Sequence, residues 1–356
     1  MENASHPMHA TSGLRFERGG GTLPGRATGA VFGGSAAATA AVLLATGVFT
    51  VPLTLVFGTV LAAIVLYAWA RALEGPRRAL DRVMTLWIAA AFGLAMIPLF
   101  SLIFEVAKRG IPGLSLEFFT ADARGVVGGG GASHAIVGTL VITAVATVIS
   151  VPIGIMAAIY LTEYGTGRLR RALTFFVDVM TGIPSIVAGL FAYALFEIFL
   201  GPGIRLGVMG SVALSVLMIP IVIRSAEEVL RIVPDHLREA AYALGTPKWK
   251  TITRIVLPTA IAGLLTGVMI ALARIIGETA PLLVTTGVVD SMNTDPFNGR
   301  MQNLAVYAYN EYRSPGVMKQ AAYDKAWAAA MTLIAIVMIL NVAARLVYRR
   351  YKTEIR

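Results

Sequence analysis

The chain has 356 residues, of which 56% are hydrophobic and only 14% are charged. Soluble domains usually carry about 25% charged residues, so much of this chain is expected to lie in a solvent other than water. It has no cysteine, which excludes disulfides, thiolate catalysis and cysteine-ligated metals, and its four histidines form no metal-spaced pair. The basic residues behind the net charge of +10 lie between apolar blocks, which favours loops at a membrane surface over nucleic-acid binding.

The N-terminal part of the chain divides into a polar and an apolar segment. Residues 1–27 are polar and rich in glycine, and we expect a disordered cytoplasmic tail there with no signal peptide. No charged residue occurs from residue 27 to residue 70. A single helix of that length would be about 66 Å long, roughly twice the thickness of the hydrocarbon core of a bilayer. Two antiparallel spans fit better, so the sequence predicts a transmembrane hairpin over 28–70 with its turn near residues 50–52.

Six further apolar blocks follow a basic linker at 71–82. Such blocks are typical of membrane-spanning helices, and eight of them in one chain are hard to explain as core helices of a soluble protein. The expected fold is therefore all-α, a polytopic transmembrane helical bundle in which a six-helix core follows the hairpin. The core is expected over 83–350, with spans at 83–104, 134–161, 172–200, 207–223, 255–289 and 326–344.

Lysine and arginine are unevenly distributed between the two sets of loops. The segments 71–82, 162–171, 224–254 and the tail from residue 345 onward together hold 18 basic residues, whereas the alternate loops hold 8. Membrane proteins keep their basic loops in the cytoplasm. We therefore expect these four segments and both chain termini to be cytoplasmic.

The segment 224–258 contains a motif of fixed spacing. Glu239-Ala240-Ala241 is followed after three residues by Gly245, and nine residues later by Ile255-Val256-Leu257-Pro258. This matches the EAA-x3-G-x9-I-x-LP signature of ABC importer permeases at every signature position, so the chain resembles that family. The resemblance implies two short cytoplasmic helices, joined at the glycine, that dock into a groove on an ATPase subunit.

The residue types in this segment suit a coupling role. Gly245 can supply a turn that a Cβ would hinder, and Pro247 suits the first turn of the second helix, where its missing N–H costs nothing. Leu244, Trp249 and Ile252 are expected to be apolar anchors in the partner's groove. A surface helix with an ordinary glycine stop is the alternative, and the downstream half of the motif argues against it. The expected coupling residues are Glu239, Ala240, Ala241, Leu244, Gly245, Trp249, Ile255, Leu257 and Pro258.

Three other stretches resemble the permeases of phosphate importers. They are Gly138-Thr139-Leu140 through Tyr160-Leu161-Thr162-Glu163-Tyr164, Gly182-Ile183-Pro184-Ser185 through Leu190, and Ala273-Arg274-Ile275-Ile276-Gly277-Glu278-Thr279-Ala280-Pro281-Leu282-Leu283. The last is similar to the ARAxGETAPLL element of PstA and PstC permeases. Its residue sequence, together with the compact outer loops, favours the PstA type. The resemblance covers 83–350 and leaves the hairpin without an assigned function. It implies transport of phosphate across the cytoplasmic membrane of a bacterium.

The same resemblance implies the partners. A PstB-type ATPase dimer would bind and hydrolyse ATP, because this chain lacks the phosphate-binding GxxxxGK[ST] loop and is expected to be non-catalytic and to hold no cofactor. A PstC-type permease would complete the pore, and a PstS-type protein would deliver phosphate. Membrane lipid is the remaining partner expected.

Arg274 is the only basic residue inside the predicted spans. A charge there is costly and normally faces a cavity or a partner, and Glu278 lies one helical turn away, where the two can pair. The sequence around Gly277 and Thr279 suits a locally broken helix that lines a site. By resemblance, Arg274, Glu278 and Thr279 are expected on the phosphate path, with a purely structural ion pair as the alternative. Asp178 is expected to pair with Arg168 or Arg171.

Three alternatives to a phosphate permease are weighed against the sequence: a permease for another oxyanion, a secondary transporter and a membrane-embedded enzyme. The EAA signature is shared by sulfate and molybdate permeases, so the transported oxyanion rests on the GETAPLL-like stretch alone. An ion-coupled secondary transporter would need several polar groups in mid-membrane, and the sequence offers little beyond Arg274 and Glu278. A membrane-embedded enzyme would need a convergent set of catalytic side chains, which the sequence does not show.

Overall fold

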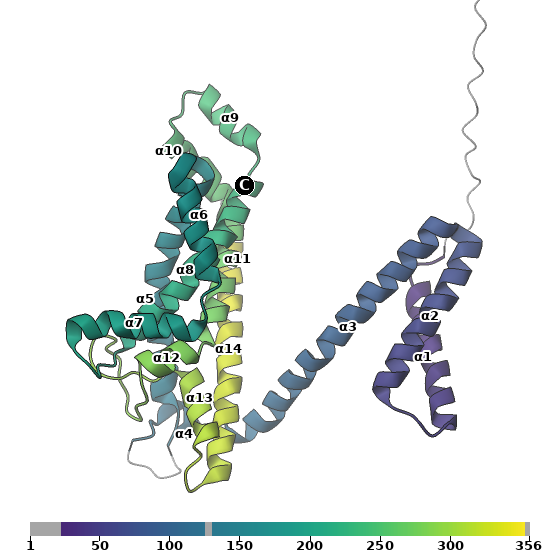
Figure 1. The fold of residues 1–356 in the computed structure, drawn as a ribbon, viewed down its shortest axis with the longest axis horizontal. Coiled ribbons are helices and arrows are strands. Elements are labelled where there is room, and N and C mark those ends of the chain that lie inside the picture. Colours follow the sequence, from purple (N-terminus) through teal and green to yellow (C-terminus); the bar gives the residue numbers. More distant parts are fainter. Residues whose placement is uncertain (1–22, 125–129, 353–356) are drawn as a thin grey trace, which may run out of the picture. The chain divides into compact units, whose positions relative to one another are not determined.

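The computed structural model describes residues 23–124 and 130–352, with side-chain surroundings up to residue 346. Most of the predicted disordered tail therefore lies outside the described residues. The chain forms two compact units, residues 1–103 and 104–356, whose boundary falls within helix α3. Within the described residues, seven helices are long and apolar enough to cross a membrane, or eight if one bent helix pair counts as a single span. This agrees with the predicted polytopic helical bundle (Figure 1).

The first unit holds the predicted hairpin. Its helices are α1 (Ala27–Ala45), α2 (Val51–Glu74) and the greater part of α3 (Pro76–Gly110). The turn occupies residues 46–50, slightly before the predicted position, because Pro52 already stands in the first turn of α2, where its missing N–H costs nothing. Gly58 lets α1 and α2 approach closely, since a Cβ there would lie 3.0 Å from the Cα of Ala36.

The basic segment at 71–82, which we expected to be a linker, is helical except at Gly75. Its residues belong to the last turn of α2 and the first turns of α3, which meet at Gly75 with a φ of +88°. Glu74 and Arg82 form a two-pronged ion pair across this break, with N···O distances of 2.6 and 2.7 Å. Arg82 also donates to the carbonyl of Leu23 at 2.7 Å, so the start of the described chain is tied to the α2–α3 junction.

The second unit contains the remaining helices. They are α4 (Leu116–Thr120), α5 (Ser133–Ile159), α6 (Gly167–Thr181), α7 (Ser185–Leu200), α8 (Gly207–Ile232), α9 (Asp235–Ala243), α10 (Lys248–Thr251), α11 (Leu257–Ile276), α12 (Ala280–Thr285), α13 (Leu304–Arg313) and α14 (Lys319–Lys352). Short non-α turns add η1 (Ile111–Gly113), η2 (Tyr160–Tyr164) and η3 (Ile252–Val256). The predicted span at 207–223 is longer than expected, because α8 continues through charged residues to Ile232.

The core of this unit lies between α5, α8, α11 and α12. It includes Ile142, Leu214 and Ala271, which are at most 1% exposed. The hydroxyl of Ser211 donates to the carbonyl of Ile142 at 3.0 Å, a contact that requires α5 and α8 to approach closely. Small residues and interhelical hydrogen bonds hold membrane helices together, because lipid tails are as apolar as the side chains.

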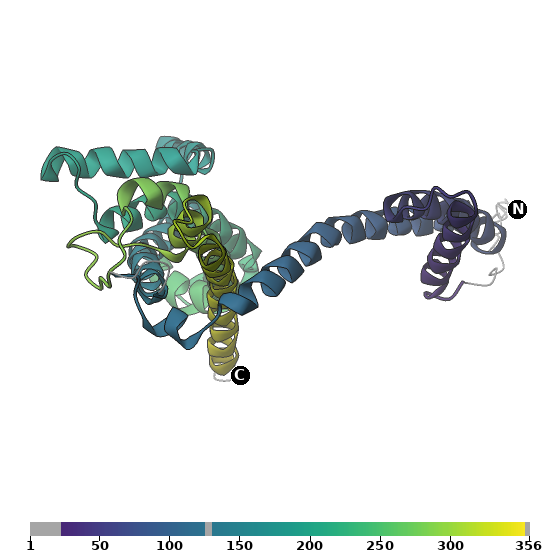
Figure 2. The same ribbon diagram turned by 90° about the horizontal axis from the view of Figure 1, so that it is seen from below.

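The predicted span at 172–200 is sharply bent rather than a single continuous helix. α6 and α7 meet at an angle of 108° across residues 182–184. Pro184 disfavours helical geometry in Ile183 and has no N–H to continue the ladder, so the helix breaks there. As a result α7 lies crosswise to the long helices of its unit, as both ribbon views show (Figures 1 and 2).

The loops of the second unit gather at two opposite ends. At one end the turn after α5 contacts the segment that carries α9 and α10, and α14 finishes there as well (Figure 1). At the other end the loop after α4 bonds to the loop after α12, with the N–H of Ala123 donating to the carbonyl of Asp290 at 3.0 Å. Three of the four basic segments therefore share one end, as the charge distribution predicts.

Candidate functional site: a coupling segment and a broken helix

The EAA-like segment forms two short helices joined at the predicted glycine. Gly245 has a φ of +73°, a conformation that glycine adopts without steric cost. Its N–H donates to the carbonyl of Tyr242 at 2.9 Å, and the N–H of Thr246 donates to that of Ala241 at 3.0 Å. These two bonds close the end of α9 in a Schellman motif. Pro247 then directly precedes α10, one position earlier than expected.

The predicted coupling residues differ in exposure. Leu244 is 85% exposed and Trp249 is 62% exposed, so both are free to contact a partner. Ile252 is only 3% exposed, so it packs within the chain and cannot serve as the third surface anchor that we expected. The remaining members divide into exposed Glu239, Ala240, Gly245 and Pro258, half-buried Ile255 and Leu257, and buried Ala241.

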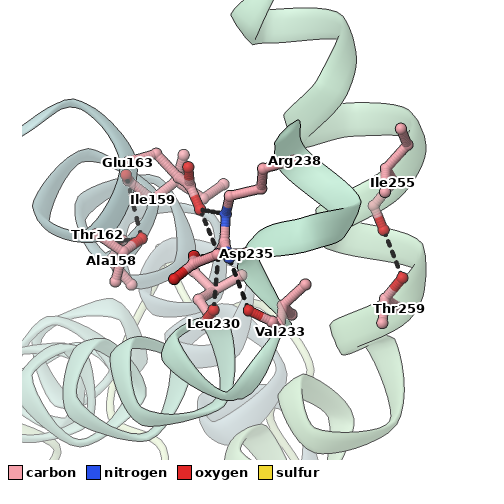
Figure 3. A network of polar contacts seen from close by, with 10 residues as sticks. All are labelled: Ala158, Ile159, Thr162, Glu163, Leu230, Val233, Asp235, Arg238, Ile255 and Thr259. Carbon is pink, nitrogen blue, oxygen red and sulfur yellow. Dashed lines mark hydrogen bonds and ion pairs between the residues drawn. The ribbon is translucent and has the colours of Figure 1, made fainter. Parts of the chain in front are cut away.

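One arginine fastens this segment to the membrane helices (Figure 3). Arg238 on α9 donates through Nε and Nη2 to Oε1 of Glu163, at 3.1 and 2.8 Å. It also donates to the backbone carbonyls of Val233 at 2.7 Å and Leu230 at 3.0 Å, and to Asp235 at 3.0 Å. The two carbonyls belong to the C-terminal end of α8, where helix carbonyls lack partners within the helix. Arg238 therefore caps α8 and holds α9 against it.

The ion pair with Glu163 is shielded from water. The Glu163 side chain is 6% exposed and that of Arg238 is 14% exposed. Glu163 lies in the π-helical turn η2 that directly follows α5, so the ion pair connects α9 to the end of a long helix. Nearby, the ammonium of Lys248 on α10 lies 4.9 Å from the ring centre of Tyr164, which adds a second contact between the coupling segment and η2.

The GETAPLL-like stretch contains the predicted break in the helix. α11 ends at Ile276 and α12 begins at Ala280, leaving Gly277, Glu278 and Thr279 between them. Arg274 stands in the last turn of α11 and is exposed. Among the described residues it has no ion-pair partner, so the expected pairing with Glu278 is absent. An exposed cation in an apolar helix is costly in lipid and normally faces a cavity or a partner.

Two of the stretches identified in the sequence meet at this break. A Cβ at Gly189 of α7 would lie 2.6 Å from the Cα of Pro281, so only glycine allows α7 to pack on α12. On the other side, the side-chain amide of Asn303 donates to the carbonyl of Glu278 at 3.4 Å. Arg205 donates to the carbonyl of Leu283 at 3.1 Å near the end of α12. The break is thus supported from several elements.

Sequence reasoning missed several of these positions. Arg238 and Glu163 both lie inside stretches that the sequence analysis singled out. No local sequence pattern, however, predicts a contact between residues 75 positions apart. Asp178 pairs with Arg224 of α8 and not with Arg168 or Arg171, so that expectation is wrong. Arg171 and Asp178 are two helical turns apart on α6, whereas α8 packs directly beside it.

Comparison with known proteins identifies the family. Residues 150–353 match the model of the family described as binding-protein-dependent transport system inner membrane component. Phosphate transport system permease protein PstA 1 of Mycobacterium tuberculosis (strain CDC 1551 / Oshkosh) is 45% identical over 275 residues, which cover 76% of this chain and 89% of that protein. The chain belongs to the PstA family.

A second PstA protein supports the same membership. Phosphate transport system permease protein PstA of Yersinia pestis is 39% identical over 282 residues, covering 78% of this chain and 92% of that protein. An inward-facing structure of the MetNI methionine ABC transporter matches with a TM-score of 0.48 and 21% identity, over 62% of this chain and 94% of that one. As a PstA-family member with seven candidate spans in the part of the chain that the structure describes, the chain is a multi-pass membrane protein and a transport subunit that works with other components of an ABC system.

Proposed function

We propose that this chain is the permease subunit of an importer that moves inorganic phosphate across the cytoplasmic membrane of a bacterium. The observation that carries the proposal is the 45% identity over 76% of the chain to a phosphate permease. The GETAPLL-like stretch lies within this part of the chain and forms a helix break beside an exposed arginine. No specific observation favours sulfate, molybdate or an ion-coupled carrier.

The coupling segment supplies the contact with the energy source. ATP is bound and hydrolysed by a separate PstB-type ATPase dimer, and this chain is non-catalytic and holds no cofactor. Exposed Leu244 and Trp249 enter a groove of the ATPase, while the largely shielded pair of Arg238 and Glu163 transmits its movement to α5. The α9–α10 end of the bundle and both termini are then cytoplasmic, in agreement with the charge distribution.

The phosphate path runs along the break between α11 and α12. Arg274 presents a planar guanidinium that can hold phosphate by two parallel hydrogen bonds, and Glu278 and Thr279 border it. Because Arg274 is exposed in the single chain, the path lies at the surface that a PstC-type permease covers. A PstS-type protein delivers phosphate at the opposite end from α9 and α10.

Uptake by the reconstituted complex tests this function. The chain, a PstC-type permease, a PstB-type ATPase and a PstS-type protein are placed in proteoliposomes, and radiolabelled phosphate uptake is measured with and without ATP. Uptake should require both ATP and the ATPase, and unlabelled phosphate should compete far better than sulfate or molybdate. Equal competition by sulfate would overturn the assignment of the oxyanion. Uptake by the chain alone would instead indicate a secondary transporter.

A further inference from the structure

A pocket of about 780 Å³ lies between the start of α6 and the second half of α8. Its lining includes Arg170 and Arg171 from α6 and Arg224 and Arg231 from α8. It also includes the backbone at Gly165, two residues after Glu163, so it stands at the end of the unit that carries the coupling segment. It is separate from Arg274 and from the helix break that borders the proposed phosphate path.

The acidic residues of the pocket are already engaged. The Glu227 carboxylate, whose side chain is 7% exposed, accepts from Nη1 of Arg224 at 3.0 Å and from Nη2 of Arg231. Asp178 also accepts from Arg224. A buried carboxylate needs such partners, and in satisfying it the two arginines of α8 become fixed in position. Arg231 is 60% exposed and keeps further N–H donors toward solvent.

The two arginines that α6 contributes to the pocket have no such partners. Arg170 and Arg171 are exposed, and in the described part of the chain neither makes an ion pair. Four arginines against Asp178 and Glu227 leave the pocket with a formal charge of +2. Positive charge held in a concave site concentrates anions there.

The backbone adds to this positive field. α6 is 15 residues long, and the residue before it, Thr166, makes no side-chain cap. The first N–H groups of a helix lack partners within it and carry the positive end of the helix dipole. Thr166 and Gly167 both line the pocket, so the uncapped end of α6 and the unpaired arginines act on the same space.

We propose that this pocket binds an anion bearing a phosphate group, either free inorganic phosphate or the headgroup of an anionic phospholipid. Arginine forks bind phosphate oxygens by paired, charge-assisted hydrogen bonds, and the pocket charge matches that of a phosphate group. The four-arginine lining distinguishes the site from the scattered basic residues of a membrane-facing loop. The inference stands whichever solute the importer carries.

Ligand-induced stabilisation of the full chain tests the site. In the first arm, the chain in phosphatidylcholine nanodiscs is titrated with inorganic phosphate at constant ionic strength, and the midpoint of thermal unfolding is recorded. In the second arm, phosphate is omitted and phosphatidylglycerol replaces part of the phosphatidylcholine. The variant R170Q/R171Q removes the unpaired arginines, and R168Q is the matched control, an exposed arginine of the same helix outside the pocket lining.

At least one arm should give a saturable rise in the midpoint. The R170Q/R171Q variant should weaken the apparent affinity at least about tenfold, because charge-assisted hydrogen bonds are lost, and R168Q should change it little. A response to phosphate alone would identify the free anion, and a response to phosphatidylglycerol alone would identify the headgroup. No response in either arm, an unchanged response in R170Q/R171Q, or an equal loss in R168Q would each overturn the proposal.

Discussion

The ion pair between Arg238 and Glu163 gives a sharp test of how the coupling segment is held. The substitution Glu163→Gln keeps the size of the side chain and one acceptor oxygen but removes the charge. Arg238 retains its bonds to the carbonyls of Leu230 and Val233 and to Asp235. The change therefore isolates the charged contact between α9 and the end of α5.

The expected magnitude follows from the number of bonds and their burial. Two hydrogen bonds join Arg238 to Glu163, and both side chains are mostly shielded from water. Hydrogen bonds to charged groups contribute about 1.5–3 kcal/mol. The guanidinium of Arg238 stays charged when Gln replaces Glu163, but the acceptor loses its charge, so each bond should lose about 1 kcal/mol. We expect the docking of α9 to weaken by about 2 kcal/mol. Complete removal of one partner of a buried pair would cost more, about 3–5 kcal/mol.

Hydrogen exchange of the α9 amides measures this docking directly, because local opening exposes them to solvent. A loss of about 2 kcal/mol corresponds to exchange about 30-fold faster. The matched control is Asp235→Asn, which removes a second acid from the same arginine. The Asp235 side chain is 88% exposed, so its pair should contribute at most about 1 kcal/mol. If Glu163→Gln accelerates exchange no more than Asp235→Asn, the buried pair does not anchor α9.

Three further predictions test other parts of the molecule. Gly245→Val places a β-branched residue at a φ of +73°, where even a simple side chain costs about 1–2 kcal/mol. A pull-down with this variant should recover less ATPase, while the chain still reaches the membrane. Full recovery of the ATPase would contradict the coupling role. Arg274→Gln and Arg274→Lys should both reduce phosphate uptake, and the Lys variant should retain part of it. Adding Glu278→Gln should not rescue Arg274→Gln, because the two side chains do not pair. Rescue of uptake to the wild-type rate at normal membrane abundance would show that the pair is structural. Burial raises the pKa of Glu311, with Lys325 opposing and Asp290 adding to the shift. The carboxyl of Glu311 therefore stays protonated to a higher pH in the folded chain than in the unfolded chain. Stability should fall as pH rises from the unfolded pKa through the folded pKa. Glu311→Gln should therefore raise the unfolding midpoint at neutral pH, by an amount that shrinks in acid; a constant gain at all pH values would refute this.

Short motifs with fixed local geometry could be predicted from the sequence. The glycine turn after α9 formed as expected, because a left-handed residue at a helix end depends on only a few neighbouring residues. The break after α11 was equally local, since it depends on Gly277 and on Pro281 in the first turn of α12. The length of the apolar blocks predicted a membrane protein for a similar reason, because the length of a span follows from the thickness of the bilayer.

Some errors came from reading composition without backbone geometry. The apolar block at 172–200 predicted one span, although Pro184 already carried the signal for a break. The charged residues after 223 suggested a loop, but α8 continues because Glu227 lies between Arg224 and Arg231 on one helix face and pairs with both. Charged residues therefore indicate the boundary of the membrane more reliably than they indicate the end of a helix.

The sequence by itself determined that this chain crosses a membrane, which end of the bundle carries the basic loops, and where the coupling helices turn. Only the tertiary structure decided which charges pair: Arg238 with Glu163, Arg224 with Asp178, and Arg274 with none of the described residues. The physical reason is distance along the chain. Turns and spans depend on residues within one or two helical turns, whereas ion pairs between helices depend on how those helices pack, which local pattern does not encode.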